Sequence, residues 1–231
     1  MLKSYIAFDL ETTGLKPQEN EIIEIGALKV REGKVVDRFM EFIHPLSPIS
    51  SAISELTGIT NDMVATARSC EQVLPDFLDF CEDDVLIGHN VMFDYSFTKC
   101  SASKCGLPFE KNGLDTLKIA RKVHKDFPSK SLGALCDYYH IENKSAHRAY
   151  HDALATAKLY QTLAHYFEES DPKLFKPLPL IYKVKTVQPA TPKQLALIER
   201  LIPQKEYSGE WDPETITRSD ASRLIDALLK M

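Results

Sequence analysis

The sequence predicts an α/β domain with a mixed central β-sheet, followed by a small helical appendage. Near the N-terminus, three strand-like segments follow one another with short connections, which is typical of antiparallel neighbours. Beyond residue 50, helical patterns alternate with short apolar segments, as in domains whose helices cover a sheet. After residue 169, a proline-rich stretch precedes two short amphipathic helices.

The first strand is expected at Tyr5–Leu10 and the second at Glu21–Val30, because both are apolar runs with the length of a buried strand. Gly14 and Pro17 interrupt the chain between them and indicate a loop. A third strand is expected at Lys34–Ile43. The later elements are expected as helices at 50–57 and 69–81, a strand at 85–88, a helix at 93–105, a strand at 114–117 that runs into a helix ending at 123, and helices at 131–139 and 149–168.

Three regions are predicted, namely a domain at residues 1–170, an extended linker at 171–191 and a helical module at 192–231. The two helices of the module are expected at Pro192–Ile202 and Arg218–Leu229. Helices of this length bury little apolar surface alone, so we expect them to dock on another surface or to form a small module together.

The composition is that of an ordinary globular protein, with 44% hydrophobic and 26% charged residues among 231. The N-terminus lacks the apolar core of a signal peptide, and no apolar run approaches the roughly 18 residues that span a bilayer. We therefore expect a cytoplasmic protein without membrane contact. Five cysteines occur without a C-x-x-C pair, which favours free thiols over a zinc or redox centre.

The net charge of −5 is not typical of a nucleic-acid-binding protein, which is usually basic. However, residues 97–150 carry ten Lys and Arg side chains against five Asp and Glu. This segment either offers a local surface for phosphate groups or forms ordinary solvated helix faces.

The first predicted strand ends in two carboxylates within the stretch FDLETTGL. Side chains alternate along a strand, so Asp9 and Glu11 point to the same face. Two like charges this close are unfavourable, since each raises the pKa of the other, unless a cation lies between them. The pair therefore indicates a cation site, with exposure to water or pairing with Lys or Arg as the alternatives.

Two further segments place acids where other predicted elements begin. Asp94 in GHNVMFD opens a helix after a strand, and Asp152 in SAHRAYHD opens the long helix at 149–168. Helix capping explains each acid taken singly, but three acidic positions at the edges of one sheet favour a shared site. His147 is five residues before Asp152, about 140° away on a helix, so the two converge only if His147 precedes the helix.

A zinc site is the competing interpretation, because His147 and His151 have the i, i+4 spacing of the histidines in H-E-x-x-H. Position 148 is Arg rather than Glu, and no Cys or third His offers an obvious further ligand. The sequence therefore offers little support for zinc.

FDLETTGL, HNVMFD and HRAYHD together resemble the three exonuclease motifs of the DnaQ-like family, in its histidine-containing (DEDDh) branch. That branch includes the proofreading epsilon subunit of bacterial DNA polymerase III, the exonuclease region of the Gram-positive polymerase, RNase T and oligoribonuclease. The resemblance covers about residues 5–167. It implies an RNase H-like mixed sheet flanked by helices, with residues 1–170 as the exonuclease domain.

The catalytic positions of the family fall, residue by residue, on Asp9, Glu11, Asp94, His147 and Asp152. The branch with Tyr four residues before the last acid does not fit, because Arg148 stands there. The resemblance implies two Mg²⁺ ions, replaceable by Mn²⁺, held by the four acids, with Asp9 bridging both. It also implies His147 as general base, since imidazole accepts a proton near neutral pH whereas Arg and Lys do not.

The resemblance further implies how a 3′ end is held, at positions Thr12, Thr13, Gly14, Leu15, His89 and Phe93. The hydroxyls and turn amides would contact the terminal ribose, and Gly14 would permit close backbone approach. Leu15 would wedge against the terminal base and Phe93 would stack on it. Core packing of Phe93 and an ordinary packing role for Leu15 are the alternatives.

The implied function is a metal-dependent 3′–5′ exonuclease that releases nucleoside monophosphates. The favoured substrate is DNA 3′ ends, in proofreading or repair, because TTGL and the loop at 45–48 resemble the polymerase-associated DNA exonucleases more than oligoribonuclease. RNA is the alternative substrate. An inactive nucleic-acid-binding or scaffold protein is a different class of function, opposed by the presence of all five catalytic positions. QLALI at 194–198 resembles a sliding-clamp peptide, so a clamp or a DNA polymerase is a candidate partner, although a predicted helix opposes extended docking.

Overall fold

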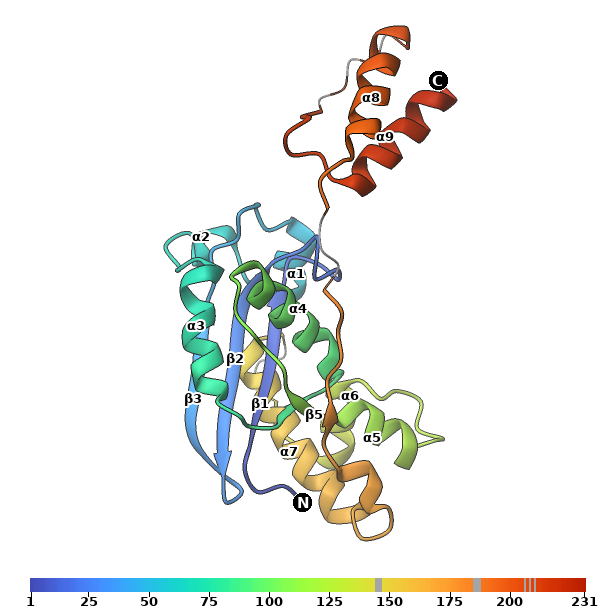
Figure 1. Cartoon of the computed structure of the whole chain (residues 1–231). Helices are drawn as coiled ribbons and strands as arrows, with labels where there is room; N and C mark the ends of the chain where they lie inside the picture. Colours follow the sequence, from blue (N-terminus) through green and yellow to red (C-terminus); the bar gives the residue numbers. More distant parts are fainter. Residues whose placement is uncertain (144–146, 185–187, 206, 208, 210) are drawn as a thin grey trace. The chain divides into compact units, whose positions relative to one another are not determined.

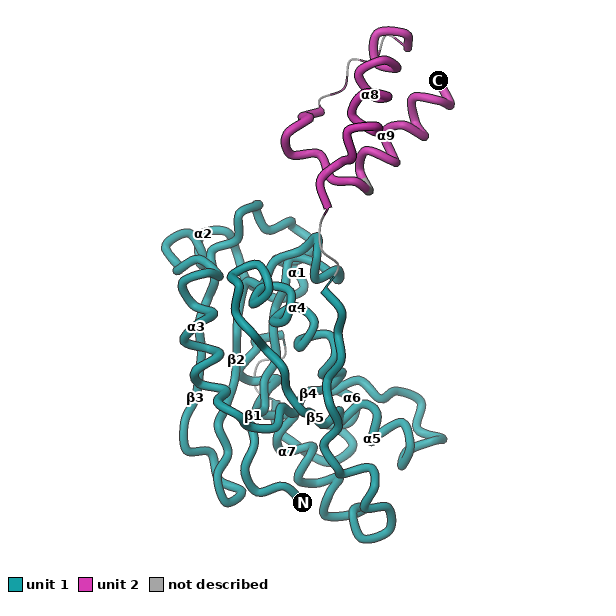
Figure 2. The backbone as a smooth tube through the Cα atoms, viewed as in Figure 1, with its two compact units in different colours: residues 1–184 teal, residues 185–231 magenta. Residues whose placement is uncertain are grey.

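The computed structural model describes residues 1–143, 147–184, 188–205, 207, 209 and 211–231. Figure 1 shows a β-sheet with helices on both faces and, later in the chain, a pair of helices. The chain divides into two compact units, residues 1–184 and 185–231, which Figure 2 colours separately.

The first unit is built on a six-stranded sheet of order β3-β2-β1-β4-β5-β6. Its long antiparallel part consists of β1 (Tyr5–Thr12), β2 (Ile22–Arg31) and β3 (Lys34–Phe42). The short strands β4 (Leu86–Gly88) and β5 (Asn112–Asp115) run parallel to β1, whereas β6 (Leu178–Pro179) runs antiparallel to β5. This mixed sheet confirms the predicted fold class.

Helices cover both faces of the sheet (Figure 1). α3 and α4 pack on one face, and α5, α6 and α7 pack on the other. The helices of the described chain are α1 (Ser51–Thr57), α2 (Asn61–Val64), α3 (Cys70–Cys81), α4 (Val91–Lys104), α5 (Thr116–Val123), α6 (Leu132–Tyr139), α7 (Ala149–Phe167), the 3₁₀ helix η1 (Pro172–Phe175), α8 (Pro192–Gln204) and α9 (Arg218–Lys230).

β1 lies between the two helix layers and is buried on both faces. Ile6, Phe8 and Leu10 pack with α3 and α4, whereas Tyr5 and Ala7 pack with the helices of the opposite layer. A strand covered on both faces needs apolar residues in succession, which explains the unbroken apolar run in the sequence.

The stretch after α7 differs from the extended linker expected at 171–191. Residues 172–175 form η1, and Leu178–Pro179 pair with β5 as an edge strand. Leu180 is 7% exposed and fills the space beside Gly113, where a Cβ would lie 2.7 Å from Leu180 Cδ1. A proline-rich segment can occupy this place because an edge strand leaves one row of backbone groups unpaired.

The second unit is a pair of helices with its own small core. Ile198, Leu201, Ala221 and Leu228 are buried between α8 and α9. The stretch QLALI at 194–198 is thus helical and contributes Ile198 to this core. Such a placement opposes its use as an extended clamp-binding peptide.

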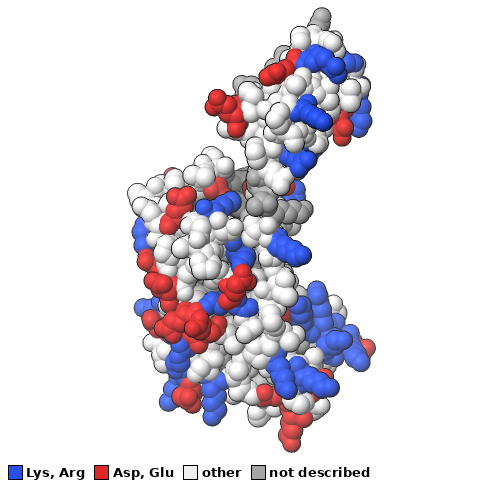
Figure 3. Space-filling model, in the orientation of Figure 1, with Lys and Arg blue, Asp and Glu red and all other residues white. Residues whose placement is uncertain are grey.

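Charged side chains are unevenly distributed over the surface. On the face drawn in Figure 3, Lys and Arg gather over the part of the first unit where α5 lies, and Asp and Glu gather near the end of α3. Among helices of the described residues, none combines the length and the apolar character that crossing a membrane requires.

Candidate active site

β1 directs the side chains of Asp9 and Glu11 to the face of the sheet that α7 covers. Every second residue of a strand shares a face, and Tyr5 and Ala7 of this strand pack with α7. Both acids are partly buried. The strand therefore carries two carboxylates towards the first turn of α7.

Asp94 reaches β1 from the first turn of α4. It is 3% exposed, and the backbone N–H of Leu10 donates a hydrogen bond to Asp94 Oδ1 at 3.1 Å. α4 begins after Asn90, whose φ of 73° turns the chain sharply from β4 into the helix. The hydrogen bond to Leu10, the neighbour of Asp9 in the chain, holds Asp94 next to the other acids.

Asp152 lies in the first turn of α7, and His147 lies just before this helix. Asp152 is 8% exposed and accepts hydrogen bonds from the His147 N–H at 2.8 Å and from Asn143 Nδ2 at 2.7 Å. α7 begins at Ala149, so His147 precedes it, as its spacing from Asp152 requires. His147 is exposed and has a φ of 64°, a left-handed conformation that is uncommon outside glycine.

Residues of β1 and of the start of α7 meet at one pocket, and Asp94 is not part of its lining. One ligand atom from each of Glu11, His147 and Asp152 lies within 4.8 Å of the other two. The pocket at this point has a volume of about 370 Å³, and its lining includes Asp9, His89, Asn143, His147 and Asp152. Residues far apart in the sequence are thus brought together as a candidate active site.

The carboxylates of this pocket hinder one another's ionisation. Burial raises the pKa of Asp9 well above its ordinary value, and the charges of Asp94 and Glu11 raise it further. Burial, followed by the charge of Asp152, raises the pKa of Glu11 to about 8. Burial also raises the pKa of Asp94, although the Leu10 hydrogen bond opposes this effect.

Within the described chain, none of these four acids has a Lys or Arg nitrogen within 4.0 Å. The alternative in which basic side chains neutralise the pair on β1 is therefore not observed. Asn143 Oδ1 is also buried without a hydrogen-bond partner among the described residues. Clustered carboxylates and an unpaired amide oxygen are the ligands that a hard divalent cation prefers.

Gly26 allows α7 to lie directly on the sheet. This residue is paired with Asp9 across the β1–β2 ladder. A Cβ at Gly26 would lie 2.0 Å from the backbone nitrogen of Tyr150 and 2.2 Å from the carbonyl carbon of Ala149. The absence of a side chain therefore brings the first turn of α7, which carries Asp152, to the level of Asp9.

An ion pair between a buried Glu and a partly exposed Arg fixes the same end of α7, and it was not predicted from the sequence. Glu24 on β2 is 5% exposed and is paired with Glu11 across the ladder. Its carboxylate accepts hydrogen bonds from Arg148 Nη2 at 2.9 Å and from the Ala149 N–H at 3.1 Å. The available signal was a charged residue inside the apolar strand EIIEIGALKV. The Arg148 guanidinium also lies over the ring of Phe42, 5.2 Å from its centroid.

His89, predicted to lie near substrate, lines the pocket with both ring nitrogens engaged. Nδ1 is 2.9 Å from Thr116 Oγ1, and Nε2 is 2.8 Å from the Lys130 carbonyl oxygen. Burial lowers the pKa of His89, which favours the neutral ring. This histidine therefore ties β4 to α5 and to the residues before α6.

The other residues predicted to hold a 3′ end lie in the turn after β1 and on α4. The Thr12 hydroxyl donates to the Gly14 carbonyl at 2.7 Å, and the Thr13 hydroxyl accepts from the Glu21 N–H at 2.9 Å. Both hydroxyls thus stabilise the turn itself. Leu15 projects from this turn and is 81% exposed. Phe93 is partly buried and packs 4.9 Å from Phe97 between ring centroids.

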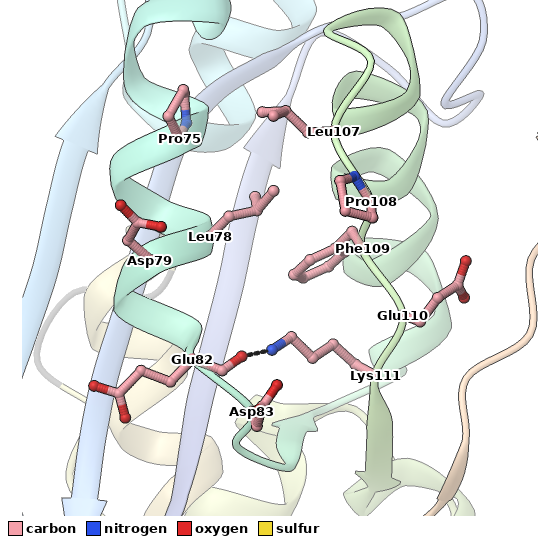
Figure 4. A pocket seen from close by; sticks show the side chains of 10 residues that line it. All are labelled: Pro75, Leu78, Asp79, Glu82, Asp83, Leu107, Pro108, Phe109, Glu110 and Lys111. Atoms are coloured by element: carbon pink, nitrogen blue, oxygen red, sulfur yellow. Dashed lines mark hydrogen bonds between the residues drawn. The ribbon is translucent and has the colours of Figure 1, made fainter.

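A larger hollow elsewhere contains none of the predicted site residues. It has a volume of about 810 Å³ and lies between α3 and residues 107–111 (Figure 4). Leu78 and Phe109 line it, and Lys111 Nζ donates to the Glu82 carbonyl oxygen across one end. Size alone therefore does not identify the functional pocket.

Comparison with known proteins places the first unit among exonucleases. Residues 6–160 match the model of the RNase T family, described as exonuclease. The chain is 43% identical over 165 residues to the PolC-type DNA polymerase III of Caldanaerobacter subterraneus subsp. tengcongensis, covering 71% of this chain and 12% of that protein. It is 42% identical over 158 residues to the PolC-type enzyme of Thermotoga maritima, covering 68% and 12%. The chain therefore spans about an eighth of the length of these relatives.

Solved structures show the same fold. Exonuclease X in complex with 5′ overhanging duplex DNA is 27% identical, with a TM-score of 0.57 over 71% of this chain and 92% of that one. An Escherichia coli exonuclease I complex with single-stranded DNA is 18% identical, with a TM-score of 0.66 over 76% and 42%, and supports the fold alone. The family resemblance seen in the sequence is thus confirmed, and the chain belongs to the exonuclease family that its first unit matches.

Proposed function

We propose that this chain is a metal-dependent 3′–5′ exonuclease that hydrolyses phosphodiester bonds at DNA 3′ ends and releases nucleoside monophosphates. The observation that carries this proposal is the convergence of acids from β1 and α7 with His147, in a member of the exonuclease family. Asp94 of α4 joins these acids through its hydrogen bond from Leu10 and its charge beside Asp9. In this proposal the first unit carries the activity, and the second unit is an appendage.

The residues of the pocket fit a pair of hard divalent cations. Asp9, Glu11, Asp94 and Asp152 would hold two Mg²⁺ ions, with Mn²⁺ able to replace them. The raised pKa values of Asp9 and Glu11 support this assignment, because burial and then mutual repulsion raise them, and bound positive charge would offset both effects. Such ions supply charge neutralisation for the attacking and leaving oxygens of an in-line displacement.

His147 is proposed as the general base. His147 is exposed and lines the pocket. Its backbone N–H donates a hydrogen bond to Asp152, which keeps this residue, and so its ring, beside the acids. The ring would accept a proton from the attacking water while the water oxygen bonds to phosphorus. The bond between phosphorus and the 3′ oxygen of the preceding nucleotide then breaks, and that oxygen is protonated from solvent.

The turn after β1 and the start of α4 are proposed to hold the terminal nucleotide. The side chain of Leu15 is highly exposed and would contact the terminal base. The ring of Phe93 would stack on that base. The backbone of Thr12, Thr13 and Gly14 would face the ribose, since the two hydroxyls stabilise the turn. His89 would shape the pocket wall.

DNA is the proposed substrate because the relatives at 42–43% identity are named as DNA polymerases. The same relatives support a DNA polymerase as the candidate partner. The test compares DNA and RNA oligonucleotides of one sequence, with paired and mispaired 3′ ends, in Mg²⁺ and in EDTA. The proposal is supported if nucleotides are released faster from DNA than from RNA in Mg²⁺ and if EDTA abolishes the release. Faster release from mispaired than from paired DNA ends supports proofreading. Preferential hydrolysis of RNA overturns the DNA assignment, and binding without hydrolysis identifies a scaffold.

A further inference from the structure

A groove with a basic rim lies at the edge of the sheet formed by β5 and β6. It has a volume of about 440 Å³ and is bounded by the start of α4, by α5 and by residues 173–180. Its floor is apolar and includes Met92, Ile119 and Leu180. Five basic side chains line it, namely Lys118, Arg121, Lys122, Lys173 and Lys176. We refer to this feature as the basic groove.

The bases of the basic groove form no ion pair with the part of the chain that the structure describes. All five side chains belong to exposed residues, and none has a carboxylate within 4.0 Å among the described residues. The acid in the lining, Asp115, is 7% exposed and accepts hydrogen bonds from the backbone of Asn90, Leu117 and Lys118. Figure 3 shows basic side chains gathered over α5 on a protein of net charge −5.

Two separate segments of the chain build this rim. Three of the bases belong to α5, and the other two lie in and just after η1. A solvated helix face would arise from one element, whereas here bases from two elements face one groove across an apolar floor. Lys173 and Lys176 also lie outside residues 6–160, the part that matches the family model. This side of the rim therefore lies beyond the residues that the family model matches.

The basic groove adjoins the candidate active site. Met92 of its floor precedes Phe93 and Asp94 in the first turn of α4. Thr116, the first residue of α5, contacts the ring of His89, and His89 lines the catalytic pocket. His89 in the pocket lining and Met92 in the groove lining are therefore three residues apart in the chain.

We propose that the basic groove binds the phosphodiester backbone of the DNA strand whose 3′ end occupies the catalytic pocket. This inference rests on the proposed function and adds a second contact to it. Lys and Arg neutralise phosphates without reading sequence, and the aliphatic floor can contact sugars and base edges. The contact would raise affinity for long strands without taking part in the chemistry.

Binding is the first test, using the full chain and a 5′-labelled single-stranded DNA of 20 nucleotides, in Ca²⁺ at several salt concentrations. The variants are the pairs Arg121→Gln with Lys122→Gln, and Lys173→Gln with Lys176→Gln. The matched control is Lys34→Gln with Arg38→Gln, on exposed positions of β3 at the opposite edge of the sheet. Each groove pair should weaken binding about tenfold and reduce the slope of log affinity against log salt by roughly 1.4, for two phosphate contacts. Equal weakening by the control pair, or no weakening by either groove pair, overturns the proposal.

Hydrolysis in Mg²⁺ separates this inference from the proposed function. The groove pairs should lower kcat/KM for the 20-nucleotide strand several-fold more than for a dinucleotide, which is too short to reach far beyond the pocket. An equal loss on both substrates contradicts a separate strand contact. If the unmodified protein hydrolyses neither substrate but the groove pairs still weaken DNA binding, the proposed activity fails while the groove assignment stands.

Discussion

The guanidinium of Arg148 binds the carboxylate of Glu24, 124 positions earlier in the chain, with Nη2 at 2.9 Å from Oε1. The Ala149 N–H donates to the same carboxylate. This ion pair joins β2 to the start of α7, between His147 and Asp152. It therefore connects the stability of the fold to the geometry of the candidate site.

Replacement of Arg148 by Met should destabilise the protein by about 2 kcal/mol, because Glu24 is then a buried carboxylate without a cation. The double variant Arg148→Met with Glu24→Gln should recover most of this loss, since the charge is gone and the amide oxygen still accepts from Ala149. Urea unfolding of the two single variants and the double variant measures the coupling. Additive losses would show that the two side chains do not act as a pair.

Replacement of Gly26 by Ala should displace the first turn of α7, because the new Cβ would meet the backbone of Tyr150 at 2.0 Å. A shift of about 1 Å at Asp152 costs on the order of a hundredfold in rate, and the clash costs roughly 1–3 kcal/mol of stability. Exonuclease assays and thermal unfolding measure both effects. Gly133→Ala is the stability control, since a Cβ there meets no atom within 4 Å. Equal stability of both variants would contradict the close contact.

The metal-free protein should lose stability as the pH rises from about 5 to about 9. The folded state raises the pKa of Glu11 from 4.5 to about 8, so the folded protein retains a proton that the unfolded chain releases. This contribution is complete below pH 4.5 and is lost as the pH passes 8. Thermal unfolding in EDTA should show the decline, and Mg²⁺ should raise the melting temperature most at high pH. In Glu11→Gln, the fall in melting temperature between low and high pH should be smaller by a few degrees. A fall as large as that of the unmodified protein would refute this role for Glu11.

Replacement of His147 by Ala should reduce kcat by a factor of about 10² to 10⁴ while the affinity for Mn²⁺ is largely retained, because the ring is assigned to proton transfer. His151→Ala is the matched control, since it removes the same group from the first turn of α7, one residue before Asp152. Single-turnover hydrolysis and Mn²⁺ titration measure the two quantities. Comparable losses of kcat in both variants would remove His147 from the role of base.

The elements that could be predicted from the sequence are those with a local pattern. The apolar run of β1 and the alternation that sets Asp9 and Glu11 on one face follow from the strand period alone. The position of His147 before α7 follows from its spacing to Asp152. A family resemblance then connected these residues with Asp94, which no local period relates to β1.

The contacts that escaped prediction join residues far apart in the chain. Nothing near Gly26 in the sequence indicates that the backbone of Tyr150 will lie against it. The contact between Glu24 and Arg148 is likewise not predictable, because the sequence shows only a charged residue in an apolar strand and an Arg before a helix. Leu180 follows a proline-rich stretch typical of a linker, yet it fills the space beside Gly113 and extends the sheet. Tertiary packing decided each of these cases.

The most direct test of the central assignment is the time course of degradation of a 5′-labelled single-stranded DNA by the unmodified protein and by Asp9→Asn. In Mg²⁺ the unmodified protein should shorten the strand from its 3′ end one nucleotide at a time, and EDTA should stop it. Asp9→Asn should lose roughly a thousandfold or more in rate, because Asp9 would hold the divalent ions on which the proposed reaction depends. Undiminished degradation by Asp9→Asn, or release from the 5′ end, would contradict the proposed active site.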